Sequence, residues 1–348
     1  MLKVGIIGAG SITERHILNY QANHCCEVVS IADINPAQAQ KTAEKFGIRS
    51  IFTDYKDILN SSEIDAVSIC TPTFTHKDIA LDAIEAHKHI LCEKPPALNA
   101  DEAAQIQSAL IGYDKVFMLG LVRRFDSKTK YLKEYIDSGK MGKIICAEAV
   151  RLGLMSMRSG WFAKRSLGGG SLIDGAIHEL DLILYLMGYP KPKTVMAFES
   201  HANSSLAGRT KSKVHKNINF DEGDIEDFIK GFVNFENGTN LYIKSGGLLL
   251  SDKTGCYCEI NGEKAGAIVE SFSEESPVKI LEVTDNLYLN NSIPHLPKIN
   301  PFEAEINHFV DCCVNGTQCM ATIDQGVMLM EIIDAIYKSA ETSSAINL

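Results

Sequence analysis

The stretch MLKVGIIGAGSITERHILNYQ, residues 1–21, decides the fold of the first part of this chain. Leu2–Ile7 is almost wholly apolar, as a strand is when both faces of its sheet are covered. A Gly-Ala-Gly turn at residues 8–10 follows, and Ile12–Gln21 has the apolar spacing of a helix. A strand, a glycine turn and a helix in this order predict a dinucleotide-binding unit, because the helix N-terminus offers free N–H groups to phosphate.

The same alternation of strands and helices continues to about residue 120. The further predicted strands are Glu27–Ala32, Ala66–Cys70, Lys88–Cys92 and Val116–Leu119. The further predicted helices are Pro36–Phe46, Phe74–His87 and Ala100–Leu110. Alternation at this spacing predicts an α/β domain over residues 1–122, with a doubly wound parallel sheet of the Rossmann type.

The rest of the chain, residues 123–348, has a different pattern in which longer β-type runs dominate. The predicted strands are Ile144–Leu152, Thr194–His201, Asp227–Phe235, Thr239–Ser245, Cys256–Asn261, Ala267–Ser271 and Lys279–Val283. Asn237-Gly238 between two of them is typical of a hairpin. We expect an open, mainly antiparallel sheet, followed by helices at about Glu303–Val314 and Ile323–Ala340 that could pack back on the first domain.

The composition limits the partners and the compartment. The formal net charge of −10 argues against nucleic acid and anionic membrane surfaces as partners. No apolar run reaches the ~20 residues that span a bilayer, and the first residues lack the pattern of a signal peptide. The ten cysteines are scattered, and the pairs Cys25-Cys26 and Cys256-x-Cys258 lack zinc-site spacing. We therefore expect a cytoplasmic protein with reduced thiols and without a metal site.

Two glycines and one carboxylate carry the prediction of a dinucleotide site. Gly8 permits the tight turn, and Gly10 lets a pyrophosphate approach the backbone at Ser11 and Ile12. Asp33 ends the second predicted strand, where a carboxylate accepts hydrogen bonds from both ribose hydroxyls and repels a 2′-phosphate. The sequence therefore predicts NAD rather than NADP, unless Asp33 is only an N-terminal acid of the next helix.

Two neighbouring features are less specific. Thr13 occupies the third position of the glycine fingerprint, where Gly or Ala is usual, and predicts slightly looser packing of the helix on its strand. The Thr71-Pro72 turn ends a strand at the edge where ligands bind in such sheets, but a plain strand-ending turn explains it equally well.

Lys94 is the first candidate catalytic residue. It lies in the segment Cys92–Pro96, directly after a predicted strand. A Lys held in a cleft at a strand end can have its pKa lowered by burial and can orient a substrate hydroxyl. An isolated Lys in a Pro-rich turn would by default be a surface residue.

A second catalytic segment follows three glycines at residues 168–170. The next predicted helix, Leu172–Met187, carries Asp174, His178 and Asp181 on one stripe. A carboxylate next to an imidazole fixes its tautomer and raises its basicity, so that it can take a proton from an alcohol as hydride leaves the carbon. The alternatives are a half-buried helix His with a polar neighbour, or two ligands of a metal site without a recognisable third.

With these residues in view, essentially the whole chain resembles the glucose–fructose oxidoreductase / inositol dehydrogenase (Gfo/Idh/MocA) family. The matching segments are Gly8–Gly10 with His16, Asp33, Asp65–Val67, Thr71-Pro72 with His76, Glu93–Pro95, Arg123–Phe125, and Gly168–Gly170 with Asp174 and His178. The resemblance implies a Rossmann domain followed by an open-sheet domain that often mediates oligomers, so a homodimer or homotetramer is expected.

The resemblance also implies an activity and roles for the site residues. It implies NAD-dependent hydride transfer between nicotinamide and a secondary alcohol of a sugar, cyclitol or sugar derivative. His178 would be the general acid/base with Asp174 as its partner, and Lys94 would polarise the oxygen and contact the nicotinamide ribose. A cis Lys94-Pro95 peptide is expected by the same analogy. The cofactor would further contact Thr71, Pro72, His76, Glu93 and Arg124, and the substrate would contact Arg123 and Trp161.

Some residues depart from the family pattern, and two other functions stay open. Pro96 stands where an aliphatic residue is usual, and Phe162 stands where Arg often follows Trp161, which weakens any inference of a charged substrate. Trp161 could equally be a core residue. The other functions are cleavage of a glycoside by an enzyme that uses bound NAD through a transient keto sugar, and non-catalytic NAD binding. Substrate choice is expected to depend on loops around Arg151–Lys164 and Ser204–Gly223.

Overall fold

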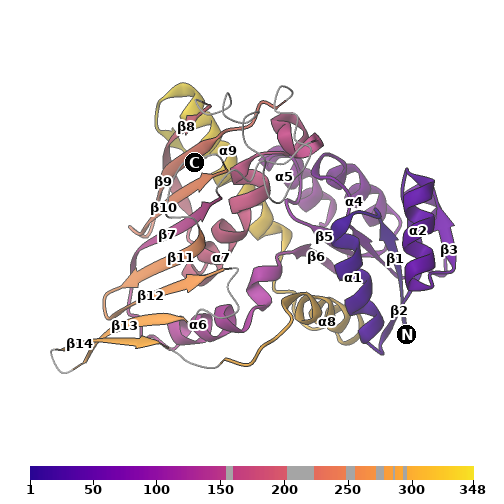
Figure 1. Ribbon diagram of the computed structural model, residues 1–348, viewed down its shortest axis with the longest axis horizontal. Helices are drawn as coiled ribbons and strands as arrows, with labels where there is room; N and C mark the ends of the chain where they lie inside the picture. The colour runs from indigo at the N-terminus through magenta and orange to yellow at the C-terminus, as the bar shows by residue number, and fades with distance from the viewer. Residues whose placement is uncertain (154–159, 202–222, 248–254, 272–277, 285–286, 293–295) are drawn as a thin grey trace. The chain divides into compact units, whose positions relative to one another are not determined.

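The computed structural model describes residues 1–153, 160–201, 223–247, 255–271, 278–284, 287–292 and 296–348 (Figure 1). These residues form two units. The first unit comprises Met1–Phe125 and Ile299–Met330, and the second comprises Asp126–Lys298 and Glu331–Leu348. The predicted loop Ser204–Gly223 lies outside the described residues except for Gly223.

The first unit is built on a six-stranded sheet in which every neighbouring pair of strands is parallel. In the order β3-β2-β1-β4-β5-β6, the strands are Ser50–Phe52, Cys26–Ala32, Leu2–Ile7, Ala66–Ile69, His89–Glu93 and Phe117–Gly120. This confirms the predicted doubly wound sheet. The strand order reverses between β1 and β4, and ligands bind at the carboxyl ends of the strands at such a switch point.

Helices connect the strands of the first unit. They are α1 (Ser11–Ala22), α2 (Pro36–Phe46), α3 (Tyr55–Leu59), α4 (His76–Glu85) and α5 (Ala100–Ala109), and α8 (Pro301–Asn315) packs against α1. The sequence does not predict β3 or α3, because three and five residues are too few to show a period.

The second unit is built on a nine-stranded sheet. In the order β14-β13-β12-β11-β7-β10-β9-β8-β15, the strands are Leu287–Ser292, Lys279–Thr284, Ala265–Glu270, Gly255–Gly262, Ile144–Leu152, Asn240–Gly246, Phe228–Phe235, Pro192–Ser200 and Ile346–Asn347. The β7–β10 pair is parallel and the other pairs are antiparallel, which confirms the predicted mainly antiparallel sheet. The parallel pair, β14 and β15 are not predicted by the sequence.

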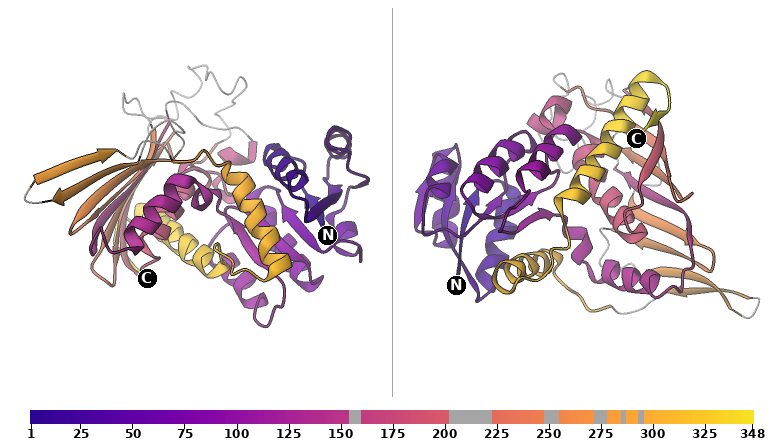
Figure 2. Two further views of the ribbon diagram at one scale, coloured as in Figure 1. Left: turned by 90° about the horizontal axis from the view of Figure 1, so that it is seen from below. Right: turned by 180° about the vertical axis from the view of Figure 1, so that it is seen from behind.

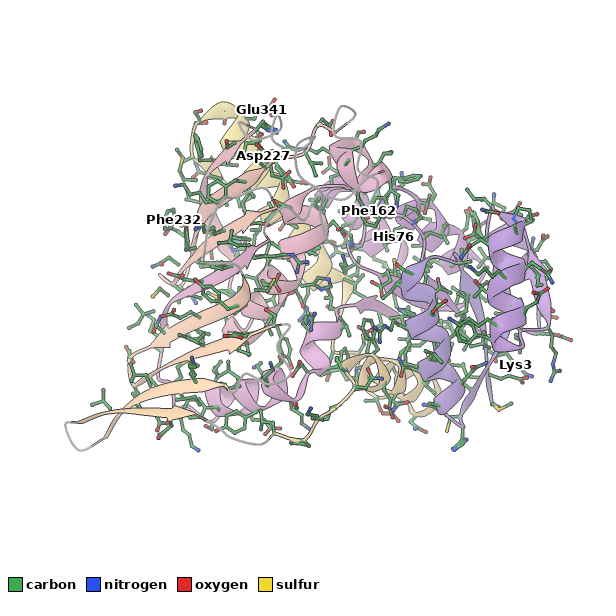
Figure 3. All side chains as sticks on the ribbon, in the orientation of Figure 1. Lys3, His76, Phe162, Asp227, Phe232 and Glu341 are labelled. Atoms are coloured by element: carbon green, nitrogen blue, oxygen red, sulfur yellow. The ribbon has the colours of Figure 1, made fainter. Side chains whose placement is uncertain are left out.

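Helices of the second unit lie on one face of this sheet (Figure 2). Helix α7 (Ile177–Met187) packs against β7 and β11, and α6 (Ser127–Asp137), which the sequence does not predict, packs against α7. Helix α9 (Ile323–Thr342) begins in the first unit and ends in the second. The opposite face of the sheet carries exposed side chains such as Phe232 (Figure 3), and β9 therefore alternates buried and exposed residues.

Among the described residues, none of the helices combines the length and the apolar character that crossing a bilayer requires.

Candidate active site

The glycine turn after β1 has the geometry that a dinucleotide site needs. Gly8 has a φ of +99°, and a Cβ there would lie 2.8 Å from the Cys70 carbonyl oxygen, so only glycine fits. A Cβ at Gly10 would meet nothing nearer than that same oxygen at 3.9 Å. Gly10 precedes α1 without a side-chain cap, so the first N–H groups of the helix, at Ser11 and Ile12, can serve a phosphate. The residues present therefore fit a bound dinucleotide.

Thr13 does not loosen the packing of α1, contrary to the expectation from the fingerprint. Its side chain is fully buried, and its hydroxyl donates a hydrogen bond of 2.8 Å to the Gly8 carbonyl. The hydroxyl thus holds the glycine turn to the helix by a contact that Gly or Ala could not make.

Asp33 lies at the end of β2 and is tied to the same turn. Its Oδ2 accepts a 2.7 Å hydrogen bond from the Ala9 N–H, and its Oδ1 accepts one of 2.8 Å from the Asn35 N–H. The side chain of Asn35 accepts from the N–H groups of Ala37 and Gln38 and so caps α2. Asn35, and not Asp33, therefore caps α2. This favours a ligand role for Asp33 over the helix-capping role that was its alternative.

Sequence reasoning missed three side chains around this turn. Gln38 donates a 3.0 Å hydrogen bond to the Ala9 carbonyl. Ile34, next to Asp33, is 94% exposed, and Phe74, after the Thr71-Pro72 turn, is 41% exposed. An apolar residue directly after a strand-ending carboxylate is the signal that could have identified Ile34.

His76 connects two turns at the carboxyl ends of β4 and β5. Its Nδ1 lies 2.7 Å from the Pro95 carbonyl oxygen, and its Nε2 lies 2.8 Å from that of Thr71. Burial lowers the pKa of His76, so the neutral ring donates to one carbonyl at a time. The observed contacts tie the His76 ring to the backbone of the Thr71-Pro72 turn and of the Lys94-Pro95 turn. The predicted cofactor contact of His76 stays a prediction.

The Glu93–Pro95 turn is held by a buried ion pair. The Lys94-Pro95 peptide is cis, as expected. Glu93 Oε1 lies 2.9 Å from His16 Nε2, and Glu93 Oε2 accepts a 3.2 Å hydrogen bond from the Lys94 N–H. Burial alone lowers the pKa of His16, but Cys70 and the Glu93 carboxylate raise it, and the net direction is upward.

The carboxylate of Glu93 is buried and paired with His16, and its predicted cofactor contact stays a prediction. Glu93 is 8% exposed, and Glu305 completes a buried cluster with Glu93 and His16 whose ligand-type atoms all lie within 4.8 Å of one another. His16 and Glu93 are already in direct hydrogen-bond contact, which favours an ion pair over a metal site. Lys94 itself is half-buried at the end of β5.

The two arginines of the Arg123–Phe125 match differ in exposure. Arg124 is 2% exposed, and its Nη1 donates to the Met320 carbonyl at 2.5 Å and to Gln325 Oε1 at 2.6 Å. These contacts join the 3-10 turn Val122–Phe125 to the start of α9. They give the buried Arg124 a structural role, and they do not support its predicted contact with the cofactor. Arg123 is half-buried, and its predicted substrate contact stays a prediction.

The glycine run before the second catalytic segment is required by its geometry. Gly168 and Gly170 have φ values of 83° and 142°, and a Cβ at Gly169 would lie 2.3 Å from the Phe162 carbonyl oxygen. The predicted continuous helix Leu172–Met187 is wrong at its start, because Ser171–Ala176 is a π-helix that leads into α7. Such π segments occur frequently at functional sites.

Asp174 and His178 are both half-buried residues of the second unit. Asp181 follows His178 by three residues in α7, but its side chain is 1% exposed and accepts a 2.5 Å hydrogen bond from the Tyr189 hydroxyl. Lys94 belongs to the first unit, so the three predicted catalytic residues come from both halves of the chain.

A cavity of about 240 Å³ lies in the second unit beside the π-helix. Its lining includes Arg151, Phe162, Asp174, Glu226, Ser245 and Cys256. Trp161 is half-buried and stacks on Phe162 with ring centroids 3.7 Å apart, and its predicted sugar contact stays a prediction. Sequence reasoning missed Phe162 and Glu226 as lining residues, and residues 154–159 of the predicted specificity loop lie outside the described part of the chain.

Two family models match this chain. Residues 2–121 match the model GFO_IDH_MocA, described as an oxidoreductase family with an NAD-binding Rossmann fold, and residues 133–348 match its C-terminal alpha/beta domain. The chain is 31% identical over 368 aligned residues to the D-glucoside 3-dehydrogenase of Escherichia coli (strain K12), covering 100% of this chain and 97% of that protein. It is 30% identical over 212 residues to the inositol 2-dehydrogenase of Burkholderia lata, covering 59% of this chain and 61% of that protein.

Solved structures show the same fold. Levoglucosan dehydrogenase in complex with NADH and levoglucosan superposes with a TM-score of 0.87 at 23% identity, covering 99% of each chain. The aldose-aldose oxidoreductase of Caulobacter crescentus, complexed with glycerol, superposes with a TM-score of 0.83 at 21% identity, covering 100% of this chain and 99% of that one.

Proposed function

The chain belongs to the Gfo/Idh/MocA oxidoreductase family, and from this premise we propose that it is an NAD-dependent dehydrogenase of a sugar or cyclitol alcohol. The observation that carries the proposal is the presence of a glycine turn that fits a dinucleotide in one unit and a cavity lined by Asp174 in the other. The relatives named for glucosides and inositol act on polyhydroxylated compounds. A lining of carboxylate, hydroxyl and guanidinium groups suits such a substrate.

In the proposed reaction, His178, Asp174 and Lys94 each have a separate role. Bound NAD supplies a nicotinamide ring that accepts the hydride from the alcohol carbon. His178 takes the hydroxyl proton as general base, because an imidazole titrates near neutral pH. Asp174 orients that ring and raises its basicity. Lys94 polarises the same oxygen and contacts the nicotinamide ribose, and in the reverse direction His178 returns the proton.

The proposal is tested by measuring NADH formation with a panel of glucosides, aldoses, inositols and other polyols, with mass spectrometry for co-purified nucleotide. Turnover that releases NADH with at least one of these compounds supports the proposal. Cleavage of a glycoside without net NADH release would instead assign the chain to the enzymes that use bound NAD through a keto sugar. NAD binding without turnover on any compound would leave a non-catalytic NAD-binding protein.

The cofactor specificity of this proposal rests on Asp33. The two ribose hydroxyls would donate to its carboxylate, and the exposed side chains of Ile34 and Phe74 would offer apolar surface to the adenine ring. A 2′-phosphate at this position would meet the negative charge of Asp33, which favours NAD over NADP.

Replacing Asp33 by alanine is expected to lower kcat/KM for NAD by about ten- to a hundredfold, because hydrogen bonds to a charged group are worth about 1.5–3 kcal/mol. The same change should raise kcat/KM for NADP. Asp33→Asn is the matched variant, since it removes the charge and keeps an acceptor for the Ala9 N–H. Unchanged NAD/NADP selectivity in both variants, measured by steady-state kinetics, contradicts the ribose assignment.

The exposed face of the second sheet is the surface on which we propose that the chain forms a homodimer or homotetramer. Large apolar side chains of this sheet that are 37–59% exposed include Met196, Phe198, Phe232, Ile268, Leu281 and Val283. Across β8, β9 and β10, Met196 lies opposite Phe232, which lies opposite Tyr242 with ring centroids 5.0 Å apart. A contiguous apolar patch on a sheet face is typical of a protein–protein interface.

Replacing Phe232 by glutamate is expected to weaken association by at least ~2 kcal/mol, roughly 30-fold in Kd, because it places a charge in the centre of an apolar contact. The molar mass measured by light scattering during gel filtration at low micromolar concentration should fall to that of a smaller species. Ile111→Glu, a matched change at an 86% exposed residue of the first unit, should leave the mass unchanged. An unaltered mass for both variants places the interface elsewhere.

We also propose a cytoplasmic location. All ten cysteines are placed as free thiols in the structure, and five of them are buried. Proteins of oxidising compartments commonly carry disulfides, whereas the reducing cytosol keeps thiols free.

A further inference from the structure

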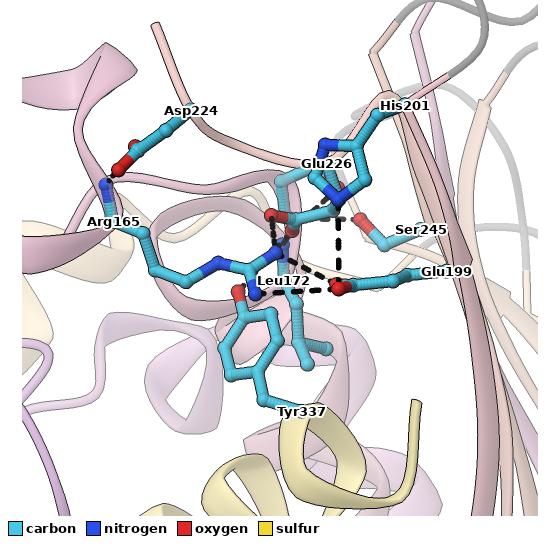
Figure 4. A network of polar contacts seen from close by, with 9 residues as sticks. Arg165, Leu172, Glu199, His201, Asp224, Glu226, Ser245 and Tyr337 are labelled. Atoms are coloured by element: carbon cyan, nitrogen blue, oxygen red, sulfur yellow. Dashed lines mark hydrogen bonds and ion pairs between the residues drawn. The ribbon is translucent and has the colours of Figure 1, made fainter. Parts of the chain in front are cut away.

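A buried carboxylate, that of Glu226, sits at the start of the π-helix of the second unit (Figure 4). Its side chain has no exposed surface. Its Oε1 accepts hydrogen bonds from the Leu172 N–H at 2.9 Å, from the Ser171 hydroxyl at 3.1 Å and from the Tyr337 hydroxyl at 3.2 Å. One oxygen therefore holds the backbone and the side chain of the first two residues of the π-helix.

The charge of Glu226 is balanced inside the protein. Arg165 Nη2 lies 3.4 Å from Glu226 Oε2 and 2.7 Å from Glu199 Oε2, and the Arg165 guanidinium lies 4.4 Å from the centroid of the Tyr337 ring (Figure 4). Burial, and then the charge of Glu226, raise the pKa of Tyr337 well above its usual range, so its hydroxyl stays protonated and donates. A buried carboxylate is tolerated only with such partners.

Further contacts surround the two ends of the π-helix. Ser245 donates a 2.8 Å hydrogen bond to the Ser171 carbonyl. Gly170 has a φ of 142°, and a Cβ there would lie 2.8 Å from the Tyr337 hydroxyl, so this position requires glycine. A Cβ at Gly175 would lie 3.0 Å from Arg151 Nε, which is a close contact. Gly175 directly follows Asp174, so the backbone that carries this carboxylate is closely packed after Asp174 and hydrogen-bonded before it, at Ser171 and Leu172.

We propose that Glu226 is a positioning residue for the dehydrogenase reaction, which holds the first turn of the π-helix and thereby sets how Asp174 and His178 stand to one another. The inference rests on the proposed function of Asp174 and His178. Glu226 and Asp174 both line the cavity, but the side chain of Glu226 is fully buried, with Oε1 engaged by the π-helix and Oε2 by Arg165. Glu226 therefore acts through the backbone and not on the substrate.

Glu226→Gln tests this proposal, since it keeps the shape of the side chain and removes the negative charge. The hydrogen bonds from Ser171, Leu172 and Tyr337 to this side chain should then weaken. We expect kcat to fall by about tenfold to a hundredfold, because a misplacement of about 1 Å can cost that much, while KM for NAD stays the same. Glu199→Gln is the matched control, because it removes the charge of the carboxylate 2.7 Å from Arg165, and Glu199 makes none of the hydrogen bonds to the π-helix given above. Equal kcat in the two variants overturns the proposal.

A readout that does not need turnover separates this inference from the proposed function. NMR titration of histidines labelled at the ring carbon, with His178 assigned by the His178→Ala variant, reports the midpoint of its protonation. We expect Glu226→Gln to lower this midpoint by roughly one pH unit, because a displaced Asp174 stabilises the imidazolium less. Glu199→Gln should leave the midpoint unchanged. An unshifted midpoint in Glu226→Gln refutes the positioning role, whether or not the protein turns over a sugar.

Tyr337→Phe is a milder variant in case Glu226→Gln does not fold. It removes one of the three hydrogen bonds to Glu226 Oε1 and leaves the ring under Arg165. We expect a fall of the His178 midpoint in the same direction and of smaller size, with the protein still folded by circular dichroism. A midpoint equal to that of the unaltered protein contradicts the proposal.

Discussion

Replacing His178 by alanine is expected to lower kcat by about 10²–10⁴-fold, because a positioned general base contributes about that much to proton transfer. NAD affinity, measured by isothermal titration calorimetry, should stay nearly unchanged, since the glycine turn and Asp33 belong to the first unit and His178 to the second. The rate is followed by the absorbance of NADH with the substrate found in the polyol panel.

His24→Ala serves as the matched control for this experiment, because His24 is an exposed histidine of the first unit, away from the glycine turn in sequence. The control should keep both its turnover and its NAD affinity. If His178→Ala instead weakens NAD binding and keeps a normal kcat at saturating NAD, then His178 binds the cofactor and is not the general base. A variant with normal turnover would remove His178 from the chemistry altogether.

Replacing Lys94 by alanine is expected to lower kcat by about 10²–10³-fold, the loss seen when one positioned donor to a reacting oxygen is removed. The Michaelis constant for NAD should rise as well, since Lys94 is proposed to contact the nicotinamide ribose. Lys94→Arg keeps the positive charge but replaces a compact ammonium by a broad, planar group. We therefore expect it to restore NAD affinity and not turnover.

Lys115→Ala is the control for the Lys94 variants, because this lysine of the first unit forms a surface ion pair with Asp114 at 3.3 Å. Such pairs contribute little, so activity and stability should remain those of the unaltered protein. If Lys94→Arg turns over as fast as the unaltered protein, then only a positive charge is needed at this position. If Lys94→Ala is fully active, the Glu93–Pro95 turn has a structural role only.

The first unit could be predicted in detail because its signals are local. The apolar run of β1, the glycine turn and the helical spacing of α1 are neighbours in the chain, and each acts through the backbone of a few residues. Asp33 could be predicted because its distance from the glycine turn is set by one strand–turn–helix unit. The His16–Glu93 ion pair escaped prediction, since 77 residues separate two side chains that only the sheet brings together.

The second unit shows the same limit more strongly. The spacing of residues 172–187 predicts one regular helix, and the structure has a π-helix at its start instead. The hydrogen bond that the Leu172 N–H donates to Glu226 spans 54 residues, and the Tyr337 hydroxyl donates to the same carboxylate across 111 residues. A helical period carries no information on such partners, because it reports only which residues share a face.

The sequence by itself determined the two sheet types, the glycine turn with Asp33, and the identity of Lys94, Asp174 and His178 as candidates, because strand period, turn chemistry and residue type are properties of short segments. Only the tertiary structure decided that Thr13 tightens its turn, that Arg124 is turned inward, and that Asp174 stands on a π-helix held by Glu226. Those outcomes depend on hydrogen bonds and close approaches between segments far apart in the chain, which exist only once the strands and helices have packed.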